Sequence, residues 1–112
     1  MTDSISLDDF QKVDMRVATV IAASPNEGAR KPAYVLDLDF GDDLGIKRSS
    51  AQITERYSSS ELVGLQVVAV VNFPPIRING VKSEVLVLGA LGENGVILLK
   101  PQKPVVNGTS IA

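Results

Sequence analysis

The stretch that decides the fold is residues 66–90, QVVAVVNFPPIRINGVKSEVLVLGA. Its two apolar runs, Val67–Val71 and Val85–Leu88, are short and rich in β-branched residues, which predicts buried strands rather than helices. The Pro74-Pro75 pair lacks amide donors and must interrupt strand pairing. The Asn79-Gly80 dipeptide favours the positive φ angles of a tight turn. The stretch therefore predicts an apolar hairpin with polar residues gathered at its mouth, where a recognition site is expected.

Three strands are expected ahead of this hairpin. The first covers residues 15–23, where the alternation of a strand points every second side chain inward. The expected inward residues are Met15, Val17, Thr19 and Ile21. The second strand covers residues 34–40, in which apolar and polar residues alternate most regularly. The third, residues 45–53, is unusually polar for a strand.

Two short helices are expected beside these strands. Ser6 and Asp9 have the spacing of a capping box, which predicts a helix that begins after Ser6. A second helix is expected over residues 54–62, with Thr54 as its cap. Residues 1–5, which precede the first helix, are expected to be frayed.

The order of the elements predicts an all-β protein. Residues 96–99 continue the series of strands after the hairpin, and residues 109–112 are a candidate edge strand. Five or six short strands with one helix between the third and the fourth are typical of a small five-stranded oligonucleotide/oligosaccharide-binding (OB) barrel. Residues 1–112 are expected to form one domain of this kind.

Composition excludes several classes of function. The chain has no cysteine and no histidine, which removes disulfide scaffolds, thiol nucleophiles, Cys/His zinc sites and Ser-His-Asp triads. Its net charge of −2 provides no general attraction for nucleic acid. No apolar run approaches the ~20 residues of a membrane span, and no signal peptide is recognisable. We expect a cytoplasmic binding protein that is not an enzyme, needs no cofactor and does not insert into membranes.

Some strands are apolar on both faces, which indicates a further partner surface. An isolated barrel needs only its inner face to be apolar, yet Val67–Val71, Val85–Leu88 and Ile97–Leu99 carry almost no polar residues. One short helix cannot cover three strands, so a symmetric homodimer is the simplest explanation. The expected interface residues are Phe10, Val87, Leu98 and Ile111.

Two possible chemical sites are weaker than their structural alternatives. Residues 37–48 begin like a calcium loop, but the twelfth position, which requires a bidentate acid, is Arg48. Lys47 and Ser49 share one strand face, as a serine–lysine nucleophile pair would, but the sequence identifies no oxyanion site or further base. A solvated acidic turn and a non-catalytic strand are the favoured interpretations.

The mouth of the hairpin is the better candidate. Asn72, Phe73, Ser83 and Glu84 are grouped there and can form a binding site. The alternative is structural: Asn72 and Ser83 bond backbone groups, Glu84 pairs with Arg77 or Lys82, and Phe73 plugs the barrel end. The residues alone leave both possibilities open.

Basic residues form two segments that are free of acids. Arg77 and Lys82 lie between Leu62 and Ser83, and Lys47 and Arg48 lie between Leu44 and Thr54. Two such segments that converge on one barrel face, together with Arg30 and Lys31, would form a basic surface. The alternative is scattered, solvated charge.

Two motifs carry a resemblance to a known family. They are G-I-K-x-S-S-A-Q-I-T, from Gly45, and N-F-P-P-x-x-I-x-G-x-K-S-E-V-L-V-L-G, from Asn72. Together they resemble the CsaA group of the tRNA-binding-domain family, over nearly the whole chain from about Phe10. Many relatives that bind structured tRNA carry S-E-G-M where this chain has Ser83-Glu84-Val85-Leu86, a departure that favours the chaperone group.

The resemblance implies an OB barrel, a homodimer and a role in protein export. The expected function is ATP-independent capture of unfolded preproteins, in partnership with the export motor; the alternative is a tRNA-binding module that uses the same barrel face. The positions expected to contact peptide or RNA are Lys47, Arg48, Ser49, Gln52, Asn72, Phe73, Pro74, Arg77, Lys82, Ser83 and Glu84.

Overall fold

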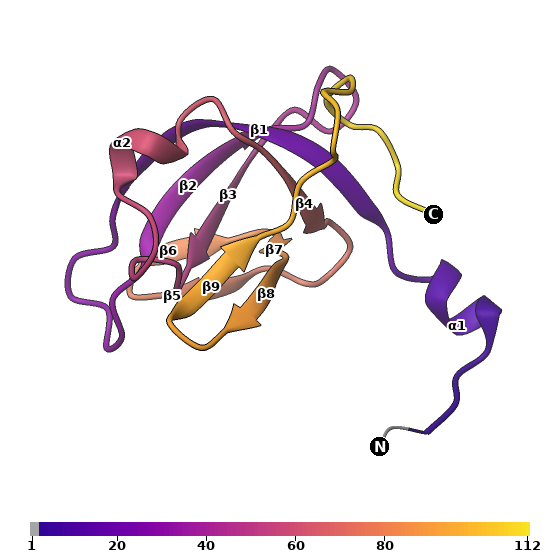
Figure 1. The fold of residues 1–112 in the computed structure, drawn as a ribbon, viewed down its shortest axis with the longest axis horizontal. Coiled ribbons are helices and arrows are strands. Elements are labelled where there is room, and N and C mark those ends of the chain that lie inside the picture. Colours follow the sequence, from indigo (N-terminus) through magenta and orange to yellow (C-terminus); the bar gives the residue numbers. More distant parts are fainter. Residues whose placement is uncertain (1–2) are drawn as a thin grey trace.

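The computed structural model describes residues 3–112 and is organised around a five-stranded antiparallel sheet (Figure 1). The strand order is β3-β2-β1-β4-β7. The strands are β1 (Met15–Pro25), β2 (Tyr34–Asp39), β3 (Ile46–Ala51), β4 (Gln66–Val70) and β7 (Leu86–Val87). The first half of β1 pairs with β4 and its second half with β2, with a register shift between Val20 and Ala22. Because one long strand serves two neighbours, the sheet curls into a barrel.

The barrel closes where β3 meets residues 83–85. The Glu84 amide donates to the Arg48 carbonyl at 2.8 Å, and the Ser49 hydroxyl donates to the Val85 carbonyl at 3.0 Å. These bonds bring together the two outer strands of the sheet and leave a nearly closed barrel. The prediction of a small all-β, five-stranded OB barrel is confirmed.

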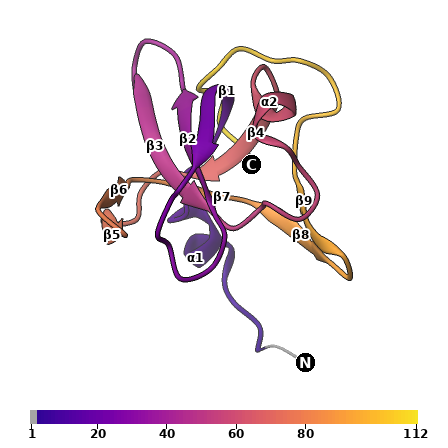
Figure 2. The same ribbon diagram turned by 90° about the vertical axis from the view of Figure 1, so that its left-hand side faces the viewer.

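Two small hairpins project from opposite sides of the barrel (Figure 2). One is formed by β5 (Ile76–Ile78) and β6 (Val81–Ser83), the other by β8 (Gly89–Gly92) and β9 (Gly95–Leu98). The predicted pairing of residues 67–71 with residues 85–88 is confirmed by β4 and β7. The Asn79-Gly80 turn, with φ angles of 51° and 80°, closes the separate β5–β6 hairpin instead.

Both predicted helices are present, but the second is shorter than expected. Helix α1 spans Leu7–Gln11, and the Ser6 hydroxyl accepts the Asp9 amide at 3.0 Å as predicted. Helix α2 spans only Ser59–Leu62, between β3 and β4. Its cap is Ser58, whose amide donates to the Glu61 carboxylate at 2.6 Å, so the prediction of Thr54 as the cap was wrong. Thr54 begins a turn, not a helix.

The barrel core is mostly aliphatic, and β1 presents to it the face opposite to the predicted one. Ala18 and Val20 join the core cluster, whereas Ile21 is 43% exposed; of the predicted inward set only Val17 is fully buried, and it lies outside that cluster. The reason is that this half of β1 carries apolar residues on both faces, so alternation alone does not decide which face points inward; Val17, on the other face, is covered by residues 108 and 109. The core consists of Ala18, Val20, Leu36, Leu38, Phe40, Ile53, Leu62, Val67, Ala69 and Val85.

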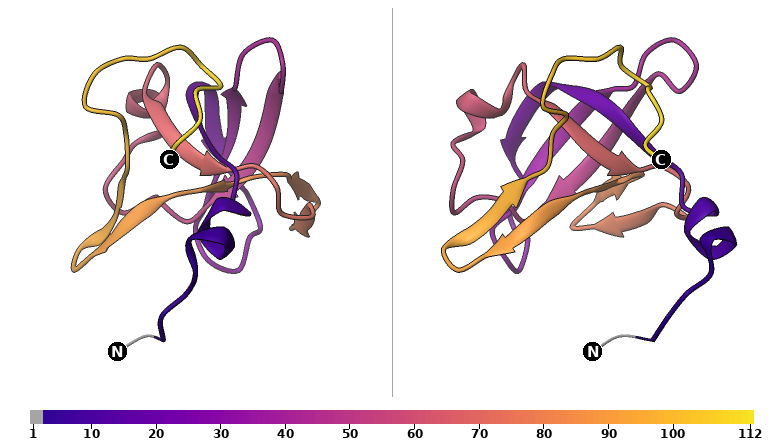
Figure 3. Two further views of the ribbon diagram at one scale, coloured as in Figure 1. Left: turned by 90° about the vertical axis from the view of Figure 1, so that its right-hand side faces the viewer. Right: turned by 45° about the vertical axis from the view of Figure 1, so that its right-hand side comes forward.

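The segment after β9 runs back over the barrel to the start of β1 (Figure 3). Both polar groups of the Gln66 side-chain amide bond the backbone of Val105, and Val17 exchanges backbone bonds with Gly108 and Thr109. The predicted edge strand over residues 109–112 is reduced to one isolated bridge, between Arg16 and Ser110. This segment helps to bury β1 and β4 within one chain.

Little regular structure precedes helix α1 among the described residues. Of the residues expected to be frayed, Met1 and Thr2 lie outside the described range, and residues 3–5 belong to no helix or strand. Among residues 3–112 there is no helix long and apolar enough to span a membrane.

Candidate ligand-binding groove

Two adjoining hollows form a groove on the side of the barrel where β3 approaches β7; we call this the open side. The first, about 380 Å³, is lined by Ser50, Phe73, Pro74, Ile76, Ile78, Ser83, Glu84, Val85 and Leu86. The second, about 420 Å³, is lined by Ser49, Ser50, Ala51, Gln52, Ile53, Leu86, Val87, Leu88, Gly89, Leu91 and Val96. They share Ser50 and Leu86, and each has a volume typical of ligand pockets. We refer to both together as the groove.

The groove is apolar and nearly free of charge. Phe73 is 52% exposed, and Ile76 and Leu86 are also exposed, so apolar surface faces solvent instead of the core. Phe73 lies after the end of β4 at Val70 and directly before the Pro74-Pro75 pair, in a segment that belongs to no strand. Glu84 is the one ionisable side chain in the lining of either hollow. The site is therefore suited to an uncharged, apolar ligand.

Ser83 and Glu84 bind the edge of β3. The Ser83 hydroxyl accepts the Ser50 amide at 3.1 Å, and the Glu84 carboxylate accepts the Arg48 amide at 3.1 Å. The Glu84 carboxylate also lies 4.0 Å from the Lys47 ammonium. The suggested pairing of Glu84 with Arg77 or Lys82 was wrong, because β3 lies closer to Glu84 across the closing seam of the barrel.

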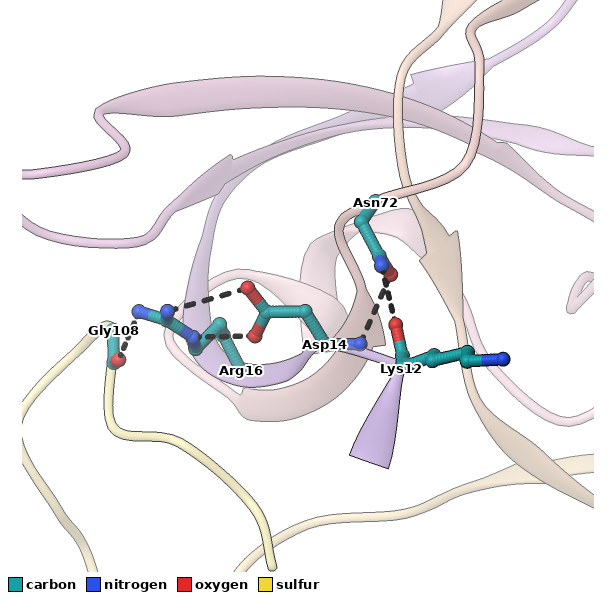
Figure 4. A network of polar contacts seen from close by, with 5 residues as sticks. All are labelled: Lys12, Asp14, Arg16, Asn72 and Gly108. Atoms are coloured by element: carbon teal, nitrogen blue, oxygen red, sulfur yellow. Dashed lines mark hydrogen bonds and ion pairs between the residues drawn. The ribbon is translucent and has the colours of Figure 1, made fainter. Parts of the chain in front are cut away.

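Asn72 lies outside the lining of the groove and ties two chain segments together (Figure 4). Its side-chain oxygen accepts the Asp14 amide at 2.9 Å, and its side-chain nitrogen donates to the Lys12 carbonyl at 2.6 Å. Asp14 in turn holds Arg16 through two hydrogen bonds, and Arg16 donates to the Gly108 carbonyl at 3.2 Å. Asn72 thus anchors the connection between α1 and β1.

The four basic residues expected to contact a ligand do not form one free cationic surface. They are Lys47, Arg48, Arg77 and Lys82. Arg48 bonds the Asp37 carboxylate at 2.8 and 3.3 Å; this hydrogen bond and the attraction between the charges raise the pKa of the guanidinium. Lys47 faces Glu84. Arg77 and Lys82 are cross-strand neighbours on the exposed β5–β6 hairpin, and within residues 3–112 neither forms an ion pair.

A second basic segment lies beside this hairpin. Asn26 is buried and donates to the Ser50 hydroxyl at 3.0 Å and to the Ile78 carbonyl at 3.3 Å, while Asn79 donates to the Glu27 carbonyl. These bonds hold the β1–β2 loop, which carries Arg30 and Lys31, against the β5–β6 hairpin. We call Arg30, Lys31, Arg77 and Lys82 the clasp cations.

The sequence prediction located much of the groove and missed part of its lining. Phe73, Pro74, Ser83, Glu84, Ser49 and Gln52 are lining residues, whereas Lys47, Arg48, Asn72, Arg77 and Lys82 are not. Ser49 contributes little accessible surface, since it is 1% exposed and bonded to Val85. Ile76 and Leu86 were missed. Ile76 had a local signal, because it is a large apolar residue between Pro75 and Arg77, whereas Leu86 lies within an apolar run and had none.

An OB barrel with an apolar groove on its open side defines a class of small binding modules. The family described as "Putative tRNA binding domain" matches residues 15–110. The chaperone CsaA of Bacillus anthracis is 50% identical, with a TM-score of 0.92, over 98% of this chain and 100% of that chain. CsaA of Picrophilus torridus is 48% identical, with a TM-score of 0.93, over 97% and 100%. The chain belongs to this family, as a protein of the CsaA type.

Curated relatives include much longer enzymes. The methionine–tRNA ligase of Chlorobium luteolum is 39% identical over 109 residues, which are 96% of this chain and 15% of the ligase. The chain thus spans about 15% of the length of this relative.

Proposed function

We propose that the protein captures unfolded polypeptide in the groove, as an ATP-independent chaperone for preproteins awaiting export. The observation that carries this proposal is the apolar, nearly uncharged lining of the two joined hollows. Phosphate groups would find no cation in this lining, whereas aliphatic and aromatic side chains of an unfolded chain would be removed from water. The likeness to two chaperones at about half identity supports it further.

Capture is an equilibrium between free and bound client. Phe73 and Pro74 supply a half-exposed apolar platform at one end of the groove, and Leu86 lies between the two hollows. Release needs no chemical step, because the affinity for each short client segment is limited by the small apolar area it covers. The client then passes to the export motor, which we propose as the next partner.

Phe73→Ala tests the groove directly. The ring is 52% exposed, so its removal should cost well below the ~3–5 kcal/mol of a buried Phe→Ala change. We expect affinity for an unfolded preprotein to fall about tenfold, as for loss of one aromatic anchor. Urea unfolding and fluorescence anisotropy with a labelled preprotein measure the two effects.

The matched control is Phe40→Ala, which removes a core ring that is 1% exposed and is not part of the groove lining. It should lower stability strongly and leave the affinity of the remaining folded protein unchanged. If Phe73→Ala instead lowers stability by several kcal/mol and leaves preprotein affinity intact, the groove is not the capture site.

A second candidate function is binding of RNA through the clasp cations. Two segments far apart in sequence bring Arg30 and Lys31 near Arg77 and Lys82, all exposed. The family description and the tRNA ligase relative support this candidate. The loops joining barrel strands are also where OB folds bind oligonucleotides.

Salt dependence separates the two candidates. If tRNA binds the clasp cations, log affinity should fall linearly with log salt, and Arg77→Gln or Lys82→Gln should each lower the slope by about one. Preprotein affinity should change only a few-fold between ~50 and ~200 mM salt, because apolar burial is not screened. Steep salt dependence with tRNA and no measurable preprotein binding would make RNA the ligand.

A further inference from the structure

One edge of β7 and β8 is unpaired. The Leu88 amide donates to the Val68 carbonyl of β4 at 2.9 Å, and the Leu88 carbonyl accepts the Leu99 amide at 3.2 Å. Both polar groups of Leu88 therefore point to the side occupied by β4 and β9. Since backbone groups alternate along a strand, the amides and carbonyls of Val87 and Gly89 point to the other side, where both residues line the second hollow.

The pairing of Gly89 confirms this direction. Gly89 is opposite Leu98 in the β8–β9 ladder, and the Leu98 amide donates to the Tyr57 hydroxyl at 3.0 Å instead of to β8. The Gly89–Leu98 pair is therefore a non-hydrogen-bonded pair of the ladder. Within residues 3–112, the second hollow is thus bordered by a strand edge without backbone partners.

The opposite wall of the hollow is the end of β3. The Arg48 and Ser50 amides point away from β2, because they bond Glu84 and Ser83. The Ser50 carbonyl faces the same way, and neither it nor the Gln52 amide has a hydrogen-bond partner among the described residues. The side chains of Ser83 and Glu84 thus satisfy the first half of the β3 edge and leave the second half open.

We propose that an extended segment of client polypeptide enters the second hollow as an added strand, between the end of β3 and the β7–β8 edge. This inference rests on the proposed function and specifies how the client binds. Two facing rows of alternating amides and carbonyls match an extended main chain, which carries donors and acceptors along both of its edges. Nucleic acid has no such rows, and the lining of the second hollow holds no charged side chain to bind its phosphates.

The geometry also defines the preferred sequence of the client. Successive side chains of an added strand point to opposite faces, so every second residue would contact the apolar lining, in which Ile53, Leu86 and Val96 take part. The alternate residues would face solvent and tolerate polar side chains. Proline would be excluded from the centre of the segment because it lacks an amide donor.

Backbone-modified peptides test the added strand. The probe is labelled acetyl-Lys-Val-Thr-Val-Thr-Val-Lys-amide, compared with versions that carry one N-methyl group at a central residue. Each central N-methyl should weaken binding by about fivefold or more, since it removes one hydrogen bond and adds bulk. N-methylation of the terminal lysine is the matched control and should leave affinity within about twofold.

Amide hydrogen exchange by NMR gives an independent measurement. The Val87, Gly89 and Gln52 amides should exchange rapidly in the free protein and slow at least tenfold with saturating peptide, as for newly paired strand amides. The Leu88 amide, already bonded to Val68, should change little.

The outcomes distinguish this inference from the proposed function. If the peptide binds and Phe73→Ala weakens it, but N-methylation and amide exchange show no effect, strand addition is wrong and groove capture stands. If neither the peptide nor an unfolded preprotein binds, both the added strand and the proposed function are wrong. Protection of Val87 that rises with protein concentration without peptide would assign the edge to a second copy of this chain and overturn the inference.

Discussion

At the scale of single residues, neighbouring side chains in one motif have different tasks. Asn72 and Phe73 are adjacent, yet Asn72 bonds Lys12 and Asp14 while Phe73 faces the groove. Ser83 and Glu84 border the groove and at the same time satisfy the amides of β3. A polar residue at the mouth of a barrel is therefore not by itself a ligand contact.

Asn72→Ala should separate anchoring from binding. It removes two hydrogen bonds that hold the entry to β1, which predicts a loss of about 1–2 kcal/mol in the free energy of unfolding. Preprotein affinity should stay unchanged, the reverse of the effects of Phe73→Ala. Urea unfolding and anisotropy titration measure both quantities. Reduced affinity with intact stability would return Asn72 to the ligand site.

At the scale of elements, short hairpins determine where the groove lies. The β5–β6 hairpin contributes Ile76, Ile78 and Ser83 to the first hollow, and its turn depends on Gly80 at a φ of 80°. The loop between β1 and β2 supports it through Asn26 and Asn79. The shape of the first hollow thus depends on one tight turn.

Gly80→Ala should destabilise the hairpin by about 1–2 kcal/mol, because an L-residue at positive φ is strained although the space around it is open. Gly64→Ala is the matched control: its φ is 95°, its surroundings are also open, and it lies outside the lining of the groove. Both variants should lose similar stability in urea, and only Gly80→Ala should weaken peptide binding. Equal affinities would show that the turn does not shape the site.

At the scale of the whole molecule, two hollowed surfaces among the described residues are lined by exposed apolar side chains from several elements. One is the groove. The other is formed by α1 and the C-terminus, where Leu7, Phe10, Val13 and Ile111 surround a hollow of about 230 Å³. Two of the residues predicted at a dimer interface, Phe10 and Ile111, lie there, whereas Val87 and Leu98 pack against the core. We propose that this second surface takes part in a homodimer.

Sedimentation at micromolar concentration should give about twice the 11.9 kDa of one chain. Phe10→Asp and Ile111→Asp should shift the protein toward the monomer, because a charge at the centre of an apolar interface is strongly unfavourable. Val87→Asp is a poor probe, since it would also damage the core. A monomeric parent protein, or dimers that survive both substitutions, would remove this surface from the interface.

Most of the fold was accessible from local patterns. The apolar runs of β4 and β7, the Asn79-Gly80 turn and the Ser6 cap each depend on neighbours in the sequence, and each was predicted correctly. The inward face of β1 was not, because Val17, Ala18 and Val20 put apolar residues on both faces, and the C-terminal segment that covers Val17 is far away in the sequence. Helix α2 was predicted too long for a related reason: Thr54 and Ser58 are both possible caps, and packing selects between them.

The sequence by itself determined a small β barrel and the absence of cysteine and histidine chemistry, because composition and local backbone preferences act without regard to distant residues. It left open whether Phe73 plugs the barrel end or faces a ligand; the structure shows that the ring is 52% exposed. Only the tertiary structure decided which charges remain free. Arg48 pairs with Asp37 on the neighbouring strand, and Lys47 pairs with Glu84 from a distant part of the chain, while Arg77 and Lys82 stay exposed. The same holds for the open edge of β7 and β8, since whether a backbone amide is paired depends on where the closing strands of the barrel diverge.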